Sequence, residues 1–263
     1  MVREVDALPE HLEGGELIAP CTEARANALL FEVPGIARYL IRDGKSIDVA
    51  LTPAADRAAV RLFLLGSARG ALIHQRGELP LSAATLVAPN WKAIAICCPS
   101  AMGKSTVAAA LCRRGWLLVA DDITRVSWNG SMAIAWPSSD RLKLWRDACE
   151  MVGENADALE RVREGMEKYF LPTRAAATPA ALHVAVRLRV ATYFDSVEIA
   201  PAERAQLLAE CTFRRHWVDA LGRRADHARI TTSIARTCRG VLLSGAREHP
   251  IEELADRLAE LVR

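Results

Sequence analysis

The feature that most constrains this chain is the segment at residues 98–106, which reads Cys-Pro-Ser-Ala-Met-Gly-Lys-Ser-Thr. It follows an apolar run at 93–97 and opens an alanine-rich, helix-like run at 107–113. An apolar strand, a short loop ending in Gly-Lys-Ser and a helix form the setting of a phosphate-binding P-loop. In such a loop the backbone N–H groups cradle phosphate oxygens, and the helix N-terminus adds its positive dipole end. The sequence therefore predicts an α/β fold organised around a phosphate site.

Within this loop, Lys104 is expected to reach the terminal phosphates and Ser105 to ligate Mg²⁺. The usual pattern has glycine where this chain has Cys98, and Ala101 also stands where glycine would turn more easily. An unusual backbone conformation costs a non-glycine residue about 1 kcal/mol or more. We therefore expect weak nucleotide binding, with a loop that has lost nucleotide binding as the alternative. The residues expected to hold the nucleotide are Ser100, Ala101, Met102, Gly103, Lys104, Ser105 and Thr106.

A second apolar run, at 116–120, ends in Asp121 and Asp122. The run is typical of a buried parallel strand, so strand, helix and strand predict a right-handed βαβ unit. Ligands lie at the carboxyl ends of such strands, which places both acids beside the loop. We assign the role of catalytic base to Asp121 and the Mg²⁺-binding or orienting role to Asp122. Adjacent carboxylates should raise each other's pKa, which suits a base. The alternative to a catalytic role is that the two acids are an ordinary solvated helix cap.

Turn residues and hydrophobic periodicity divide the 263-residue chain into three regions that we expect to form one compact unit. They are a small antiparallel β-rich region at 1–53, a P-loop core at 54–200 and a C-terminal helical region at 201–263. The N-terminal strands are expected at 16–19, 28–33, 37–42 and 46–51. Helices are expected at 54–76, 141–152, 158–164, 202–221, 226–239 and 251–262.

The composition excludes several classes of protein. A net charge of +2 is too balanced to indicate nucleic-acid or membrane binding, and no apolar run is long enough to span a bilayer. The N-terminus has no apolar signal core, so we expect a cytoplasmic protein. Seven cysteines and six histidines show no metal-binding or disulfide spacing. The tryptophans are interpreted as packing residues. The sequence does not decide whether the protein forms a homo-oligomer.

The loop and the acid pair together resemble a known family. Residues 99–106 and 117–122 are similar to the kinase domain of bacterial HPr kinase/phosphorylase. This resemblance implies a P-loop kinase domain akin to phosphoenolpyruvate carboxykinase, which uses ATP and Mg²⁺ to phosphorylate a serine. It also implies that the first acid of the pair, Asp121, serves as the base.

A shorter branch of that family, encoded in lasso-peptide modification clusters, is more similar still. Its patterns resemble residues 62–81, 141–145 and 167–169, so the resemblance covers roughly 30–175. It implies that Arg141 and Lys143 neutralise charge on the transferring phosphoryl group, with Lys168 and Tyr169 as further candidates. A solvated helix face is the other interpretation of Arg141 and Lys143.

The resemblance has limits. This chain has Ser82 where the branch usually has histidine, and it lacks the Glu-x-Arg-Gly-Leu-Gly signature of true HPr kinases, which argues against HPr itself as substrate. The expected function is an ATP- and Mg²⁺-dependent kinase that phosphorylates a serine of a precursor peptide, at the C-terminus in the lasso case. The alternatives are a small-metabolite P-loop kinase and a nucleotide-gated peptide-binding module without catalysis.

Overall fold

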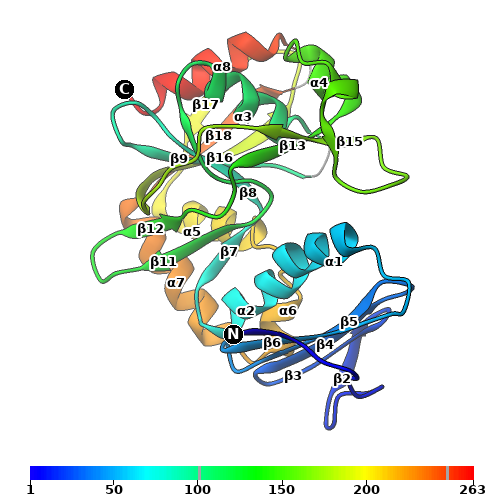
Figure 1. The fold of residues 1–263 in the computed structure, drawn as a ribbon. Coiled ribbons are helices and arrows are strands. Elements are labelled where there is room, and N and C mark those ends of the chain that lie inside the picture. The colour runs from blue at the N-terminus through cyan, green and yellow to red at the C-terminus, as the bar shows by residue number, and fades with distance from the viewer. Residues whose placement is uncertain (100–101, 247–248) are drawn as a thin grey trace. The chain divides into compact units, whose positions relative to one another are not determined.

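The computed structural model describes residues 1–99, 102–246 and 249–263 of a mixed α/β protein. Contacts divide the chain into two units (Figure 1). Unit 1 comprises Met1–Pro80 and Phe213–Arg229, and unit 2 comprises Leu81–Thr212 and Ile230–Arg263. This division differs from the boundaries expected at 53 and 200. The helices of 54–76 belong with the N-terminal sheet, and part of the C-terminal region returns to the same unit.

Unit 1 is built on an N-terminal sheet whose expected strands are confirmed. Neighbouring strands are antiparallel except β1 and β6, which are parallel. Three residues, 43–45, connect β5 and β6, and the Lys45 N–H donates to the Arg42 carbonyl at 2.9 Å. Asp43 and Gly44 both have positive φ, as the two central residues of such a hairpin turn require. In spatial order the strands are β1 (Val2–Glu4), β6 (Ser46–Leu51), β5 (Ala37–Arg42), β4 (Ala28–Val33), β3 (Thr22–Arg25) and β2 (Glu16–Ala19).

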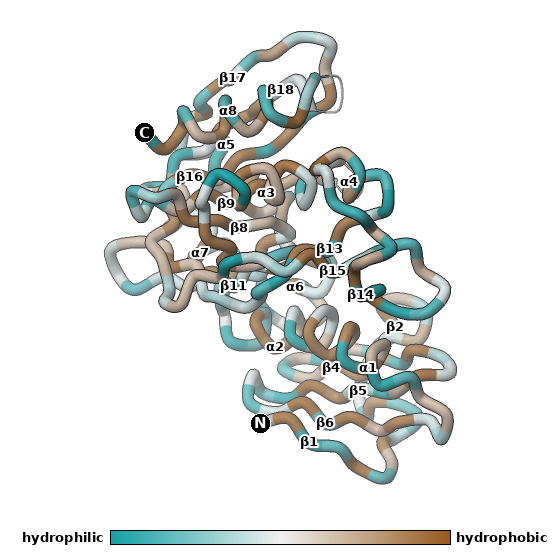
Figure 2. The backbone as a smooth tube through the Cα atoms, turned by 45° about the horizontal axis from the view of Figure 1, so that its top comes forward, coloured by the Kyte–Doolittle hydropathy of each residue, from teal (hydrophilic) through white to brown (hydrophobic). Residues whose placement is uncertain are grey.

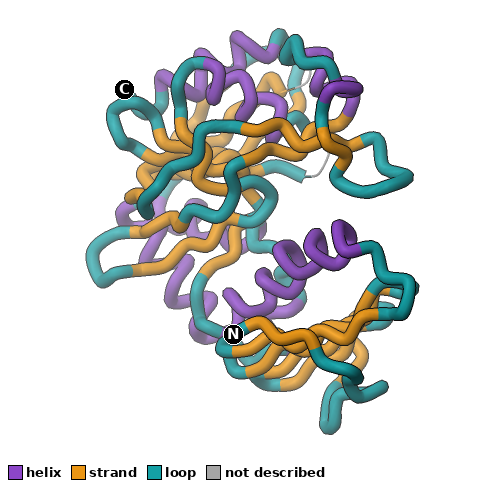
Figure 3. The backbone as a smooth tube through the Cα atoms, in the orientation of Figure 1, coloured by secondary structure: helices purple, strands orange, loops and turns teal. Residues whose placement is uncertain are grey.

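The expected helix at 54–76 is interrupted. It consists of α1 (Arg57–Phe63), the π-helical turn η1 (Leu64–Ala68) and α2 (Arg69–Gln75), which lie along the sheet (Figure 3). The buried Tyr39 hydroxyl donates to the Val60 carbonyl at 3.0 Å and so ties β5 to α1. Together with α6 (Trp217–Ala220), these helices close a core that includes the fully buried side chain of Trp217.

The central sheet of unit 2 carries the strands that flank the predicted P-loop. β9, β16 and β18 are parallel, whereas β8 runs antiparallel between β9 and β10. β9 and β10 are therefore parallel, as the βαβ prediction requires, but β8 separates them. The strands are β10 (Leu117–Ala120), β8 (Ala83–Val87), β9 (Ala93–Cys97), β16 (Ala180–Val190), β18 (Arg239–Ala246) and β17 (Asp195–Glu198), and β12 (Ala133–Trp136) and β11 (Thr124–Trp128) extend the sheet from β16. β7 (Leu79–Leu81) falls at the unit boundary.

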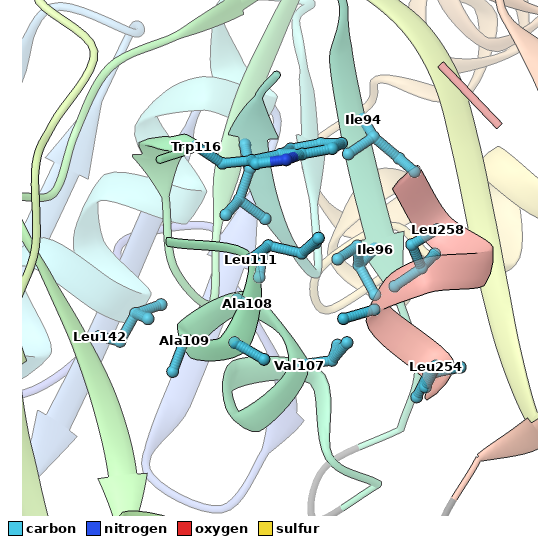
Figure 4. Packing of buried hydrophobic residues seen from close by; sticks show 14 of the residues in the cluster. Ile94, Ile96, Val107, Ala108, Ala109, Leu111, Trp116, Leu142, Leu254 and Leu258 are labelled. Atoms are coloured by element: carbon cyan, nitrogen blue, oxygen red, sulfur yellow. The ribbon is translucent and has the colours of Figure 1, made fainter. Parts of the chain in front are cut away.

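Helix α3 (Lys104–Arg113) anchors the core of unit 2. Figure 4 shows Val107 and Leu111 of α3 facing Ile96 of β9 and Leu258 of α8 (Ile251–Glu260). The chain is brown, hence apolar, along β9 in Figure 2. Six successive residues of α3, from Thr106 to Leu111, are buried, and this packing anchors the helix that begins at Lys104 and Ser105.

A separate small sheet corrects the predicted helices at 141–152 and 158–164. Residues 141–145 form strand β13 (Arg141–Trp145), and the helix α4 (Arg146–Met151) begins only afterwards. Leu142 and Leu144 alternate with polar neighbours and bury one face of β13 in the core around α3. The two-residue repeat of a strand therefore describes this segment better than the repeat of a helix. The segment at 158–164 contains the end of the 3₁₀ turn η2 (Ala156–Ala158) and β14 (Glu160–Arg161), which pairs with β15 (Lys168–Pro172).

The helix expected at 202–221 is also divided. It ends as α5 (Pro201–Glu210), after which the chain passes from unit 2 to unit 1 and forms α6. The last two helices are confirmed as α7 (Arg224–Thr237) and α8. Among the residues that the structure describes, no helix is long and apolar enough to cross a membrane.

Candidate active site

The loop after β9 enters α3 through Gly103, the N-cap residue, with φ of +86°. No atom of the described residues lies within 4 Å of where a Cβ would be, so among them only the backbone angle favours glycine here. Cys98 is buried and is not among the residues with positive φ, so the left-handed strain expected there is absent. Ser100 and Ala101 lie outside the described residues.

Asp121 follows β10 and is held through both carboxylate oxygens. The Ser105 hydroxyl donates to Oδ1 at 3.0 Å, and the backbone N–H of Lys143 donates to Oδ2 at 2.9 Å. The side chain of Asp121 is only 8% exposed. The first turn of α3, the end of β10 and the middle of β13 therefore meet at this carboxylate.

Asp122 takes a left-handed turn, with φ of +65°, which aspartate tolerates better than most residues. Its Oδ2 accepts a hydrogen bond from Lys143 Nζ at 2.9 Å, and its Oδ1 lies 4.0 Å from Lys104 Nζ. The sequence thus correctly placed the acid pair beside Lys104 and Ser105. The structure adds that Ser105 contacts Asp121, whereas the lysines contact Asp122.

The two adjacent carboxyls have opposite pKa shifts. Burial, followed by the neighbouring charge of Asp122, raises the pKa of Asp121 above its ordinary value, although Lys104 and Lys143 oppose the rise. Burial also acts to raise the pKa of Asp122, but Lys143, Lys168 and Lys104 together outweigh it and lower this pKa. The predicted effect of Asp122 on the pKa of Asp121 is present, whereas the net pKa of Asp122 is lowered because the three lysines outweigh burial.

Positive charge exceeds negative charge at this site. The ammonium groups of Lys104, Lys143 and Lys168 all act on Asp122. Among the described residues that act on the acid pair, three ammonium groups therefore face two carboxyls, of which only one is charged when Asp121 is protonated. A partly buried excess of this kind favours an anionic ligand, because the anion supplies the missing counter-charge.

Three other predicted site residues, Arg141, Met102 and Thr106, contact groups other than the acid pair. The Arg141 guanidinium pairs with Asp140 and Glu160 and lies 5.0 Å from the ring centroid of Phe170. Its place on β13, on the same face as Lys143, overturns the helix-face interpretation. Met102 packs against the α3 core, and Thr106 is buried within α3.

Sequence reasoning missed that β13 is a strand and that its backbone contributes to the site. The N–H of Lys143 reaches Asp121 only because β13 runs beside the end of β10. The alternation of polar and apolar residues at 141–145 was the available signal.

The oxygen ligands at the site suit Mg²⁺, which does not need the protein to supply all of its ligands. Ser105, Asp121 and the half-exposed Asp122 provide one hydroxyl and two carboxylates. Mg²⁺ commonly takes one or two carboxylates and completes its shell with water and substrate phosphates. Within the part of the chain that is described, no three His, Cys, Asp or Glu side chains gather in a metal-binding group.

No protein-family model matches the chain, and no curated protein matches it. Among solved structures, the chain is similar to the HPr(Ser) kinase/phosphatase from Coxiella burnetii, with a TM-score of 0.36 and 15% sequence identity. The match covers 70% of this chain and 93% of that chain. A likeness of this size assigns no activity.

Proposed function

We propose that this protein is a kinase that transfers the γ-phosphoryl group of ATP to a serine hydroxyl of a peptide. The single observation that carries the proposal is the placement of the Lys104 and Lys143 ammonium groups beside Asp122, next to Asp121 and the N-terminus of α3, with Lys168 adding its charge. A triphosphate supplies the negative charge that this cluster lacks. The acids also provide a proton acceptor, which phosphoryl transfer to a hydroxyl needs and simple anion binding does not.

The pKa directions support a division of work between the two acids. Two neighbouring carboxyls whose pKa values are pushed apart commonly act as a base and as a permanently charged group. The raised pKa of Asp121 brings it closer to neutral pH, which suits proton transfer. The lowered pKa keeps Asp122 ionised, which suits metal binding or orientation.

In the proposed reaction, the serine oxygen forms a bond to the γ-phosphorus while the bond to the β–γ bridging oxygen breaks. ADP leaves with that electron pair, and the serine proton passes to Asp121. Lys104 and Lys143 neutralise the phosphate oxygens, and α3 presents its N-terminal N–H groups to them. Mg²⁺, held by Ser105 and Asp122, would supply further positive charge to the phosphates.

The acceptor is proposed from the resemblance of residues 62–81 and 141–145 to kinases of lasso-peptide clusters. On that basis the substrate is a ribosomally made precursor peptide, phosphorylated on its C-terminal serine. This assignment is separate from the chemistry at Asp121, which would serve any serine hydroxyl.

The proposal is tested by incubating the protein with ATP, Mg²⁺ and the precursor peptide encoded beside its gene. Mass spectrometry should find one added phosphate on serine, with matching release of ADP. A parallel array of peptides with internal or C-terminal serine tests the acceptor independently. Transfer to none of these peptides would overturn the proposed activity.

A further inference from the structure

Trp145, the last residue of β13, is unusually exposed for a tryptophan that the sequence suggested was a packing residue. Its exposed fraction is 45%, whereas its strand neighbour Leu144 is buried. Alternation along β13 puts Trp145 on the same face as Lys143, whose ammonium binds Asp122. A large aromatic ring therefore lies at the rim of the site.

The residue opposite Trp145 is Lys168 of β15, its register partner in the antiparallel pair. The Lys168 ammonium lies 5.6 Å from the ring centroid of Trp145. Its charge also contributes to lowering the pKa of Asp122. Among the described residues, no carboxylate lies within ion-pair distance of Lys168.

The other cations that stack on aromatic rings of this small sheet differ in one respect. Arg141 over Phe170 is paired with acids, and so are Arg146 and Arg161 over Tyr169. An aromatic ring attracts a cation without cancelling its formal charge, whereas a carboxylate cancels it. Among these four cations, only Lys168 has its position restrained by an aromatic ring while its charge is not cancelled by an acid, so its charge can act on a ligand.

We propose that Lys168 is a third phosphate-binding cation of this active site and that Trp145 is the residue that positions it. The inference rests on the proposed function and extends it to the rim of the site. The Trp145 ring holds the ammonium on the side of β13 and β15 that faces Asp122. When the polyphosphate enters, Lys168 contacts its non-bridging oxygens together with Lys104 and Lys143.

Calorimetric titration with sodium tripolyphosphate, in the presence of Mg²⁺, tests this without knowledge of the acceptor. Lys168→Met should weaken binding about tenfold or more, the usual loss for one charge-assisted contact, and Lys168→Arg should restore most of it. Trp145→Ala should weaken binding by a smaller factor, and Trp145→Phe should recover part of that loss. Lys45→Met and Trp91→Ala, exposed residues outside the site, are the matched controls and should bind as the wild type does.

The outcomes separate this inference from the proposed function. Equal tripolyphosphate affinity in Lys168→Met and wild type would overturn the role of Lys168, even if the wild type proves to be a kinase. Unchanged affinity in Trp145→Ala, with Lys168→Met impaired, would overturn the role of Trp145. If Lys168→Met raises KM only for the peptide and binds tripolyphosphate normally, Lys168 contacts the acceptor and the inference is wrong. Thermal unfolding of each variant distinguishes a lost contact from a lost fold.

Discussion

At the scale of single residues, Lys143 connects the two halves of the acid pair. Its backbone N–H donates to Asp121 and its ammonium donates to Asp122, so one strand position orients both carboxylates. Its charge lowers the pKa of both acids. Because every substitution except proline keeps the backbone N–H, the charge of Lys143 can be removed while the hydrogen bond that holds Asp121 is kept.

Lys143→Met should move the acid limb of the pH profile of kcat/KM to higher pH. The base must be deprotonated to act, so the rate falls as the pH drops through the pKa of Asp121. Without the Lys143 charge that pKa rises further, and a higher pH is needed for the same fraction of free base. Lys143→Arg keeps the charge and should leave the limb close to its wild-type position. A limb that stays in place in Lys143→Met would contradict the role of Asp121 as base.

At the scale of elements, the parts that sequence predicted well are those specified locally. β9, α3 and β10 follow from two apolar runs and an alanine-rich helix, and each lies where expected. The insertion of β8 between β9 and β10 could not be predicted, because strand pairing is settled by contacts distant in sequence. The strand β13 was missed because a five-residue alternation competes poorly with the helix pattern that follows it.

The two ends of α3 provide a matched pair of glycines for testing the loop. Gly103 and Gly115 have φ of +86° and +88°, and at either position an added Cβ would meet no atom of the described residues within 4 Å. Each change to alanine should therefore destabilise the protein by about 1 kcal/mol through backbone strain alone. Only Gly103→Ala should also weaken tripolyphosphate binding in calorimetry, because only Gly103 leads into the N-terminus of α3. Equal affinity in both variants would show that the loop does not hold phosphate.

At the scale of the whole molecule, every residue assigned to the site belongs to unit 2. Unit 1 is assembled from two distant segments, so the three-region division expected from the sequence could not reveal it. Turn signals mark where an element ends, but they do not show that residues 213–229 pack with the N-terminal sheet. That association depends on buried side chains such as Trp217, which joins the core of Tyr39 and Ile41.

Because the site residues belong to unit 2, a substitution in unit 1 should lower the stability of the protein without changing its affinity for phosphate. Tyr39→Phe removes the buried hydrogen bond to the Val60 carbonyl and should destabilise unit 1 by about 1 kcal/mol. Chemical denaturation, followed by circular dichroism, measures that loss. Tripolyphosphate affinity should stay at the wild-type value, because no site residue lies in unit 1. A large fall in affinity would mean that unit 1 contributes to the site.

If Asp121 is the base in phosphoryl transfer, replacing its carboxylate should remove most of the transfer and leave phosphate binding intact. Wild type and Asp121→Asn are compared for the rate of ATP-dependent phosphorylation of a serine peptide, followed by mass spectrometry, and for tripolyphosphate affinity. The asparagine keeps the size of the side chain and can still accept from Lys143. Transfer should fall by about 10²- to 10⁴-fold, the usual contribution of a general base, while binding is kept or strengthened. Transfer at the wild-type rate in Asp121→Asn would contradict the account.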